Sequence, residues 1–158
     1  PVKRIALTPV GGELDVLTGS RLVEGLLSRD LQIDMACGGK GVCATCHVYV
    51  RSGRDGVSPK SAREERTIGL LATADPDSRL ACQCRIEADG VVVEVPEGLY
   101  VQAVEQVDKL VGTAAGDDFL HPLTGRRLIP KGKLITRSIF NEFVSAAKEL
   151  KRVRETPT

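Results

Sequence analysis

The sequence predicts a small α+β protein with a mixed sheet and a helix packed across it. Alternating apolar and polar residues predict strands at residues 3–8 and 13–17, because every second side chain of a strand faces the core. Leucine and valine recur at helical spacing over residues 21–29. Ser61 and Glu64 have the spacing of a capping box, which predicts the start of a second helix.

The order of these elements narrows the fold. A glycine pair separates the first two strands and predicts the turn of a β-hairpin. A cysteine-rich loop follows the first helix, and a strand is predicted from His47. After the second helix, residues 79–95 predict two short strands around Asp89-Gly90. This order is typical of a β-grasp fold: two strands, a helix, the cysteine loop, a strand, a helix and two further strands.

The last third of the chain has a different character. The tripeptide Pro-Glu-Gly predicts a boundary between a first domain, residues 1–98, and a C-terminal extension, residues 99–158. Residues 110–135 predict a hairpin whose turn is the His-Pro-Leu-Thr-Gly sequence at 121–125. An amphipathic helix is predicted from Thr136 onward, because its apolar residues fall on one face. These residues are Ile139, Phe140, Phe143, Ala147, Leu150 and Val153.

Composition and charge exclude several function classes. The chain of 158 residues has a formal net charge of +1, and no long basic run precedes residue 126, so nucleic-acid binding is not expected. No apolar stretch approaches the roughly 18 residues of a membrane span. No signal peptide is recognisable, which favours a cytoplasmic location in a bacterium. An organelle matrix, after removal of a transit peptide, is the alternative location.

The five cysteines indicate metal or redox chemistry. Three of them lie within ten positions, in the stretch CGGKGVCATCH at residues 37–47, and two more follow at residues 82 and 84. An odd number of clustered cysteines in a chain without an export signal argues against a disulfide framework. Clustered cysteines in such a chain more often bind a metal or carry out redox chemistry.

The spacing of these cysteines favours a two-iron cluster over zinc. A 2Fe-2S cluster needs four thiolates, of which one loop can supply three and a distant segment the fourth. Three glycines between the first two cysteines allow the backbone to approach the sulfurs and to point N–H groups at them. A zinc site more often has two C-x2-C pairs, and this chain has one. Zinc or bare thiols remain the alternatives.

The motif C-GGKGV-C-AT-C-HV, followed by RLAC-Q, resembles the 2Fe-2S ferredoxins of the adrenodoxin-like branch. The resemblance spans residues 3–96 and implies a β-grasp fold with a single 2Fe-2S cluster. It also implies one-electron transfer between a ferredoxin reductase and a redox acceptor protein, which is electron transport and not enzyme catalysis. The implied iron ligands are Cys37, Cys43, Cys46 and Cys82. The implied lining of the loop is Gly38, Gly39, Gly41 and Ala44.

Two assignments need separate arguments. Cys82 and Cys84 would share one face of a strand, so spacing alone admits either as the fourth ligand. The resemblance favours Cys82, which leaves Cys84 as a small core residue or, as the alternative, a spare thiol. Four cysteines suffice for the cluster, so His47 and His121 are not expected to bind iron.

The chain also departs from the family it resembles. Relatives that serve steroid-hydroxylating cytochromes have a strongly acidic second helix, whereas AREERTIGLL is mixed, so a cytochrome P450 partner is not inferred. The extension is a second departure. It is expected to pack on the first domain, to dock a partner or to form a homodimer. The alternative functions are an iron–sulfur redox sensor and an electron-feeding subunit of a larger oxidoreductase.

Overall fold

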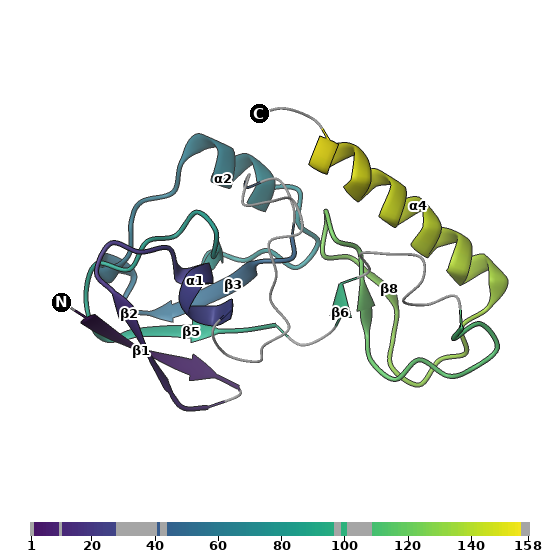
Figure 1. Cartoon of the computed structure of the whole chain (residues 1–158), viewed down its shortest axis with the longest axis horizontal. Helices are drawn as coiled ribbons and strands as arrows, with labels where there is room; N and C mark the ends of the chain where they lie inside the picture. Colours follow the sequence, from purple (N-terminus) through teal and green to yellow (C-terminus); the bar gives the residue numbers. More distant parts are fainter. Residues whose placement is uncertain are drawn as a thin grey trace.

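The computed structural model describes residues 2–9, 11–27, 41, 44–96, 99–100 and 109–155. Figure 1 shows two parts side by side along the longest axis, with β1, β5, α1 and α2 in one part and β6, β8 and α4 in the other. The first part contains Cys46 and Cys82, and the second part is the extension. Among the described residues, no helix is both long and apolar enough to cross a membrane.

The first part is built on a five-stranded mixed sheet in the order β2-β1-β5-β3-β4. β1 and β2 form the expected antiparallel hairpin, β1 and β5 run parallel, and the remaining neighbours are antiparallel. The strands are β1 (Val2–Thr8), β2 (Glu13–Leu17), β3 (His47–Ser52), β4 (Ser78–Leu80) and β5 (Val91–Glu94). This sheet with its packed helices is the predicted α+β, β-grasp architecture.

Aliphatic side chains fill the core of the first part. α1 (Leu22–Leu27) places Leu22, Val23 and Leu26 in the interior at the predicted helical spacing. Ile5 and Leu7 of β1 face the same core, as the alternating pattern predicted. The short helix η1 (Arg54–Gly56) follows β3.

The second helix, α2 (Ala62–Ile68), begins where the capping box predicted. The hydroxyl of Ser61 accepts the N–H of Glu64 at 3.1 Å. The side chain of Glu64 does not complete the box. Its carboxylate is fully buried and bonds to Arg79 and to the N–H of Leu80. A residue with the sequence signature of a helix cap therefore joins α2 to β4.

The segment after α2 differs from the prediction in one respect. β4 is only three residues long, and residues 81–83 form a turn instead of continuing the strand. Isolated bridges hold the following residues, Arg85 against Arg21 and Ile86 against Val57. β5 then pairs with β1 and β3 and does not pair with β4. Alternation in the sequence did not reveal the turn, because the alternating apolar pattern continues through it at Leu80, Cys82, Cys84 and Ile86.

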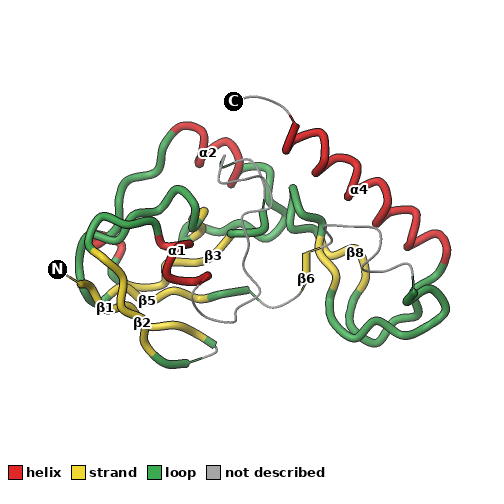
Figure 2. The backbone as a smooth tube through the Cα atoms, viewed as in Figure 1, coloured by secondary structure: helices red, strands yellow, loops and turns green. Residues whose placement is uncertain are grey.

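The extension contains the predicted hairpin and helix (Figure 2). Its three strands, β6 (Leu99–Tyr100), β7 (Phe119–Leu120) and β8 (Arg127–Ile129), lie in that order, and β7 and β8 are antiparallel. α4 (Arg137–Glu155) packs its apolar face on this sheet. Within α4 the buried residues are Phe140, Phe143, Ala146 and Leu150, while Ala147 is half-buried.

The two parts are in contact through their interiors. Tyr100 of β6 and Leu120 of β7 belong to the core cluster of the first part. A second cluster, which includes Phe119, Ile135 and Phe143, lies within the extension. The extension therefore has a core of its own and also covers the first part.

Candidate metal centre

The pairing of β3 with β4 brings two of the predicted ligands together. Cys46 directly precedes β3, and Cys82 lies in the turn after β4. The N–H of Ala81 donates to the carbonyl of Cys46 at 2.9 Å, which closes the ladder beside both thiols. Cys46 is 1% exposed and Cys82 2% exposed, so both sulfurs lie in a site largely closed to water.

The turn at residues 81–83 separates the surroundings of Cys82 from those of Cys84. The side-chain amide of Gln83 lies 3.5 Å from the sulfur of Cys82, at hydrogen-bond distance for a sulfur acceptor. Cys84 is fully buried in the core, and burial raises the pKa of its thiol to about 11.

The end of the cysteine loop approaches the same turn. Gly41 has φ +76°, and a Cβ at this position would lie 3.0 Å from Cδ of Gln83. The hydroxyl of Thr67 on α2 donates to the carbonyl of Gly41 at 2.5 Å. Glycine therefore permits both the left-handed backbone and the close approach that the loop requires. Cys37, Gly38, Gly39 and Cys43 lie outside the described residues.

Ala44 connects the cysteine loop to the extension. Its N–H donates to the carbonyl of Pro122 at 2.6 Å, and its carbonyl accepts the N–H of His47 at 2.9 Å. Ala44 is fully buried. No sequence pattern indicated that Pro122 would reach this loop, because the contact joins backbone atoms 78 positions apart.

Both histidines bond to groups other than the cysteines. Nε2 of His47 lies 2.9 Å from the hydroxyl of Ser78, and burial lowers the pKa of the imidazole to about 4, so the ring is neutral. Nε2 of His121 lies 2.8 Å from the carboxylate of Glu149. That cysteines alone supply the ligands stays a prediction.

A buried ion pair fixes the strand that leads to Cys82. Nε of Arg79 lies 2.7 Å from the carboxylate of Glu64, which also accepts the N–H of Leu80 at 2.9 Å. Arg79 is 5% exposed and Glu64 is fully buried. Sequence reasoning did not find this pair, although a glutamate and an arginine flanking a cysteine site were visible in the sequence.

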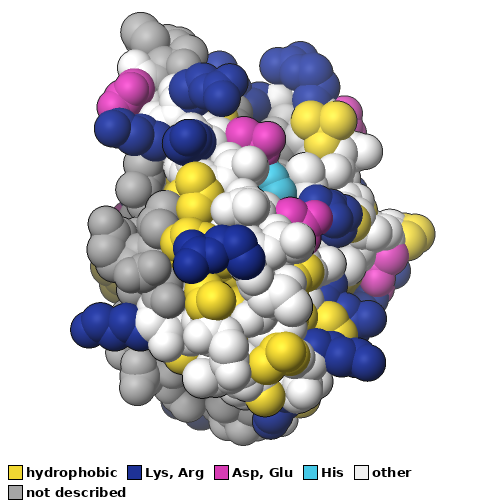
Figure 3. All heavy atoms as spheres, turned by 90° about the vertical axis from the view of Figure 1, so that its right-hand side faces the viewer, with side chains coloured by type: hydrophobic (Ala, Val, Ile, Leu, Met, Phe, Trp, Pro, Cys, Tyr) yellow, Lys and Arg dark blue, Asp and Glu magenta, His cyan; other side chains and the backbone are white. Residues whose placement is uncertain are grey.

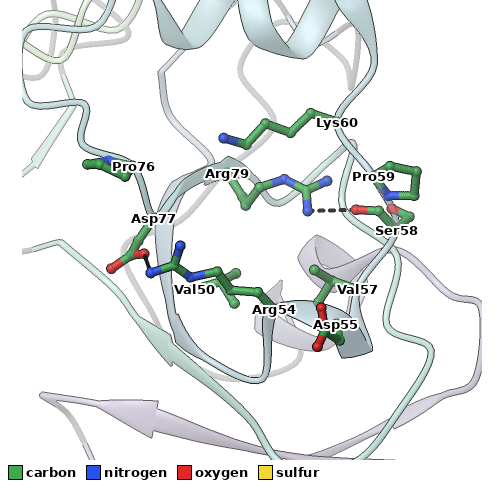
Figure 4. Close-up of a pocket in the computed structure, with 10 residues that line it drawn as sticks. All are labelled: Val50, Arg54, Asp55, Val57, Ser58, Pro59, Lys60, Pro76, Asp77 and Arg79. Carbon is green, nitrogen blue, oxygen red and sulfur yellow. Dashed lines mark hydrogen bonds and ion pairs between the residues drawn. The ribbon is translucent and has the colours of Figure 1, made fainter.

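A separate pocket of about 470 Å³ lies beside this ion pair (Figure 4). Its lining includes the basic side chains of Arg54, Lys60 and Arg79. Arg54 pairs with Asp77, and Arg79 donates to the carbonyl of Ser58 at 2.7 Å. No described cysteine lines this pocket, so it is distinct from the site of Cys46 and Cys82.

The described residues fit an iron–sulfur cluster. They supply buried sulfur donors, and Cys46, Cys82 and Cys84 are not joined by a disulfide. Gly41 leaves open the space next to Gln83 that a side chain would fill. Thiolates buried near backbone N–H groups are the usual environment of a 2Fe-2S cluster.

Comparison with known proteins agrees with this site. Residues 5–87 match the family described as the 2Fe-2S iron-sulfur cluster binding domain. The chain is 38% identical over 89 residues to a 2Fe-2S ferredoxin of Haemophilus influenzae, covering 56% of this chain and 79% of that protein. It is 44% identical over 92 residues to putidaredoxin of Pseudomonas putida, covering 54% of this chain and 84% of that protein.

Two solved structures show the same fold. The ISC-like [2Fe-2S] ferredoxin of Pseudomonas putida superposes with a TM-score of 0.56 at 26% identity, covering 60% of this chain and 92% of that chain. Putidaredoxin in its covalent complex with putidaredoxin reductase superposes with a TM-score of 0.52 at 33% identity, covering 60% of this chain and 98% of that chain.

The match covers more than half of the chain, and the chain belongs to the 2Fe-2S iron–sulfur cluster binding domain family. It is a ferredoxin of the adrenodoxin-like branch with a C-terminal extension, as its cysteine motif indicated. It binds one 2Fe-2S cluster and is an electron carrier, not an enzyme.

Proposed function

We propose that this ferredoxin carries single electrons from a ferredoxin reductase to an oxidoreductase acceptor. The observation that carries the proposal is the burial of Cys46 and Cys82 on two segments that are joined, at the end of the ladder between β3 and β4, by the backbone bond from Ala81 to Cys46. When bound, the cluster accepts one electron and releases it again. The protein supplies the burial, the hydrogen bonds and the charge that set its potential.

The proposed ligand set follows the motif. Cys46 and Cys82 are the two members that the described residues include, and the choice of Cys82 over Cys84 follows the motif and the contact of Gln83 with the sulfur of Cys82. Gln83 and Gly41 lie against the same turn. We assign the iron ligands as Cys37, Cys43, Cys46 and Cys82, and the loop lining as Gly38, Gly39, Gly41 and Ala44.

The first test is spectroscopic. Protein purified without oxygen is measured by visible absorption and electron paramagnetic resonance before and after dithionite. A cysteine-ligated 2Fe-2S cluster gives absorption that bleaches on reduction and a rhombic S = 1/2 signal in the reduced form. A colourless protein with one equivalent of zinc would contradict the proposal.

A reductase is the partner with the most support. Putidaredoxin, which resembles this chain, has been solved in a covalent complex with its reductase. The acceptor is proposed by chemical class only, as an oxidoreductase that takes electrons singly. Bacterial relatives support a cytoplasmic location in a bacterium. Purified reductase and NAD(P)H should reduce this chain; a failure with several bacterial ferredoxin reductases would remove this partner.

We also propose different roles for the two parts of the chain. Residues 1–98 form the cluster-bearing unit, and residues 99–158 are an extension with a sheet and a core of their own. A homodimer through α4 would have to use the outward side of the helix, because Phe143 and Leu150 are fully buried within the chain. Figure 3 shows basic and acidic side chains mixed over the face on the extension side. Sedimentation equilibrium distinguishes a monomer from such a dimer.

A redox sensor is the second candidate function, and one observation favours it. The carbonyl of Pro122 in the extension bonds to Ala44 beside the proposed ligand Cys46. A sensor would change the exposure of its extension with the oxidation state. Hydrogen exchange of α4 that is equal in the oxidised and the reduced protein would exclude this function and leave the carrier.

A further inference from the structure

The turn between β7 and β8 is built from side-chain and backbone bonds that start at His121. This turn, residues 121–125, is called the 121–125 turn below. The N–H of His121 donates to the carbonyl of Arg126 at 2.8 Å, and its carbonyl accepts the N–H of Gly125 at 2.8 Å. Nδ1 of the ring accepts the N–H of Leu123 at 3.1 Å. The imidazole thus accepts the N–H two residues further on, as an asparagine or aspartate side chain does in an Asx-turn.

His121 also joins the 121–125 turn to the long helix. Its Nε2 lies 2.8 Å from the carboxylate of Glu149 on α4, and the residue is 8% exposed. With Nδ1 accepting a hydrogen bond, the proton of the neutral ring is on Nε2, which can donate to Glu149. The turn is therefore fixed within the extension by bonds on both sides of one ring.

The same turn bonds to the first domain at two points. The carbonyl of Pro122 accepts the N–H of Ala44 at 2.6 Å, and the carbonyl of Thr124 accepts the N–H of Ala72 at 2.8 Å. A Cβ on Gly125 would lie 3.8 Å from Cβ of Ala44 and 3.7 Å from the hydroxyl of Thr73. The turn therefore lies directly on the segment between the second and third cysteines of the motif.

We propose that the 121–125 turn is a positioning element for the cluster, which holds the Ala44 segment in place and closes that side of the site to water. This inference rests on the proposed function, because it assigns a role towards the cluster that Cys43 and Cys46 would help to bind. It gives the extension a function in the electron carrier itself, independent of any docking partner.

The hydrogen bond to Pro122 has a predictable effect on the cluster. Reduction adds negative charge, which N–H donors and water both stabilise. The N–H of Ala44 is committed to a carbonyl, and Ala44 itself is fully buried. The turn therefore lowers the reduction potential and slows the loss of the cluster. Displacing the turn should shift the potential in the positive direction.

Two glycine variants test the proposal as a matched pair. Gly125 has φ +70°, and Gly132, also in the extension, has φ +90° with open space where a Cβ would lie. Gly125→Val and Gly132→Val both place a β-branched residue in the left-handed region and carry a similar backbone cost. Only at Gly125 do the added methyl groups, roughly 1.5 Å beyond Cβ, meet Ala44 and Thr73.

The measurements are the reduction potential, the rate of cluster loss to a chelator and hydrogen exchange of a peptide that begins at Ala44. We expect Gly125→Val to lose its cluster roughly fivefold faster, as the loss of one hydrogen bond predicts, with a more positive potential and faster exchange. Gly132→Val should match the unmodified chain. Equal rates and potentials in the two variants would overturn the proposal.

A second pair covers the case in which Gly125→Val does not fold. His121→Ala removes the bonds to Leu123 and Glu149, whereas His121→Asn can restore the Leu123 bond through its side-chain oxygen. Faster cluster loss in the alanine variant and recovery in the asparagine variant support the proposal; no change in the alanine variant overturns it. An unmodified chain that binds no cluster contradicts the proposed function itself, so the two failures are distinct.

Discussion

Cys82 and Cys84 are two positions apart in the sequence, but their side chains have different surroundings. Both belong to the same buried core cluster, but Cys82 lies in a turn beside the amide of Gln83, whereas Cys84 follows that turn and has its pKa raised by burial. A strand through this segment would have placed both on one face. The turn at residues 81–83 replaces that strand, and the sequence pattern did not reveal it, because both cysteines are apolar enough to suit a strand.

The two cysteines should therefore respond differently to substitution. Cys82→Ser is expected to abolish or severely alter the cluster, because it removes a proposed thiolate ligand. Cys84→Ser should keep the cluster while it loses some stability, since it places a hydroxyl in the core. Iron content and the visible spectrum distinguish the two. A variant pair with the opposite behaviour would reverse the ligand assignment.

Gly41 is a position at which the site has no room for a Cβ atom. Gly41→Ala adds a Cβ 3.0 Å from Gln83 in a left-handed backbone. Gly90→Ala is the control, because Gly90 has φ +86° and open space around it. The control should cost about 1 kcal/mol for its backbone, and Gly41→Ala about 1 kcal/mol more for the overlap.

The free energy of unfolding in urea measures both costs. Cluster loss to a chelator should accelerate in Gly41→Ala alone, because only that glycine lies against the turn of Cys82. If Gly90→Ala had the same effect on cluster retention, the close approach of Gly41 to Gln83 would have no role in the site.

At the scale of elements, α2 and β4 depend on the buried pair of Glu64 and Arg79. Glu64→Gln removes the negative charge and leaves a buried guanidinium without its charged partner. We expect this variant to lose about 3 to 5 kcal/mol of unfolding free energy, as is typical when one partner of a buried pair is removed. Glu65→Gln, on the exposed side of α2, is the matched control and should change little.

Urea denaturation of the apoprotein and of the loaded protein measures this effect. Because β4 leads directly into the turn that holds Cys82, Glu64→Gln should also lose its cluster faster than the control does. A loss below about 1 kcal/mol would mean that Arg79 finds another acceptor, and the pair would not be what fixes β4.

Several elements could be predicted because the spacing of their apolar residues depends only on neighbouring positions in the sequence. The β1–β2 hairpin follows from strict alternation around a glycine pair, and α4 follows from an apolar stripe of helical period. The same local rule gave an incomplete result at Glu64. The position of Glu64 matches a capping box, but its carboxylate bonds to Arg79, and no local sequence pattern indicates that long-range partner. Sequence reasoning thus found the elements and missed the bonds between them.

At the scale of the whole molecule, the extension has its own core but also contributes two residues to the core of the first part. Tyr100 and Leu120 lie in the first core, and backbone bonds join Pro122 and Thr124 to the first domain. The sequence predicted the cysteine loop and the hairpin turn separately. Their contact could not be predicted, because backbone hydrogen bonds between distant segments depend on the packing of whole elements and not on residue type.

These contacts predict cooperative unfolding. Thermal unfolding followed by cluster absorbance and by far-ultraviolet circular dichroism should give the same midpoint, because unfolding of the extension would remove Tyr100 and Leu120 from the first core. Helical signal that disappears at a lower temperature, while the colour remains, would show that the extension unfolds as an independent unit.

The parallel pairing of β1 with β5 has a consequence for biosynthesis. Ile5 of β1 pairs with Val91 of β5. β1 is synthesised first and β5 last among the strands of this sheet, so β1 cannot pair with β5 until nearly the whole first part has been made. All five cysteines leave the ribosome before that strand is complete. Contacts so distant in sequence form slowly. The thiols of Cys46, Cys82 and Cys84 are therefore accessible to iron and sulfide in the nascent chain, ahead of the fold that buries them.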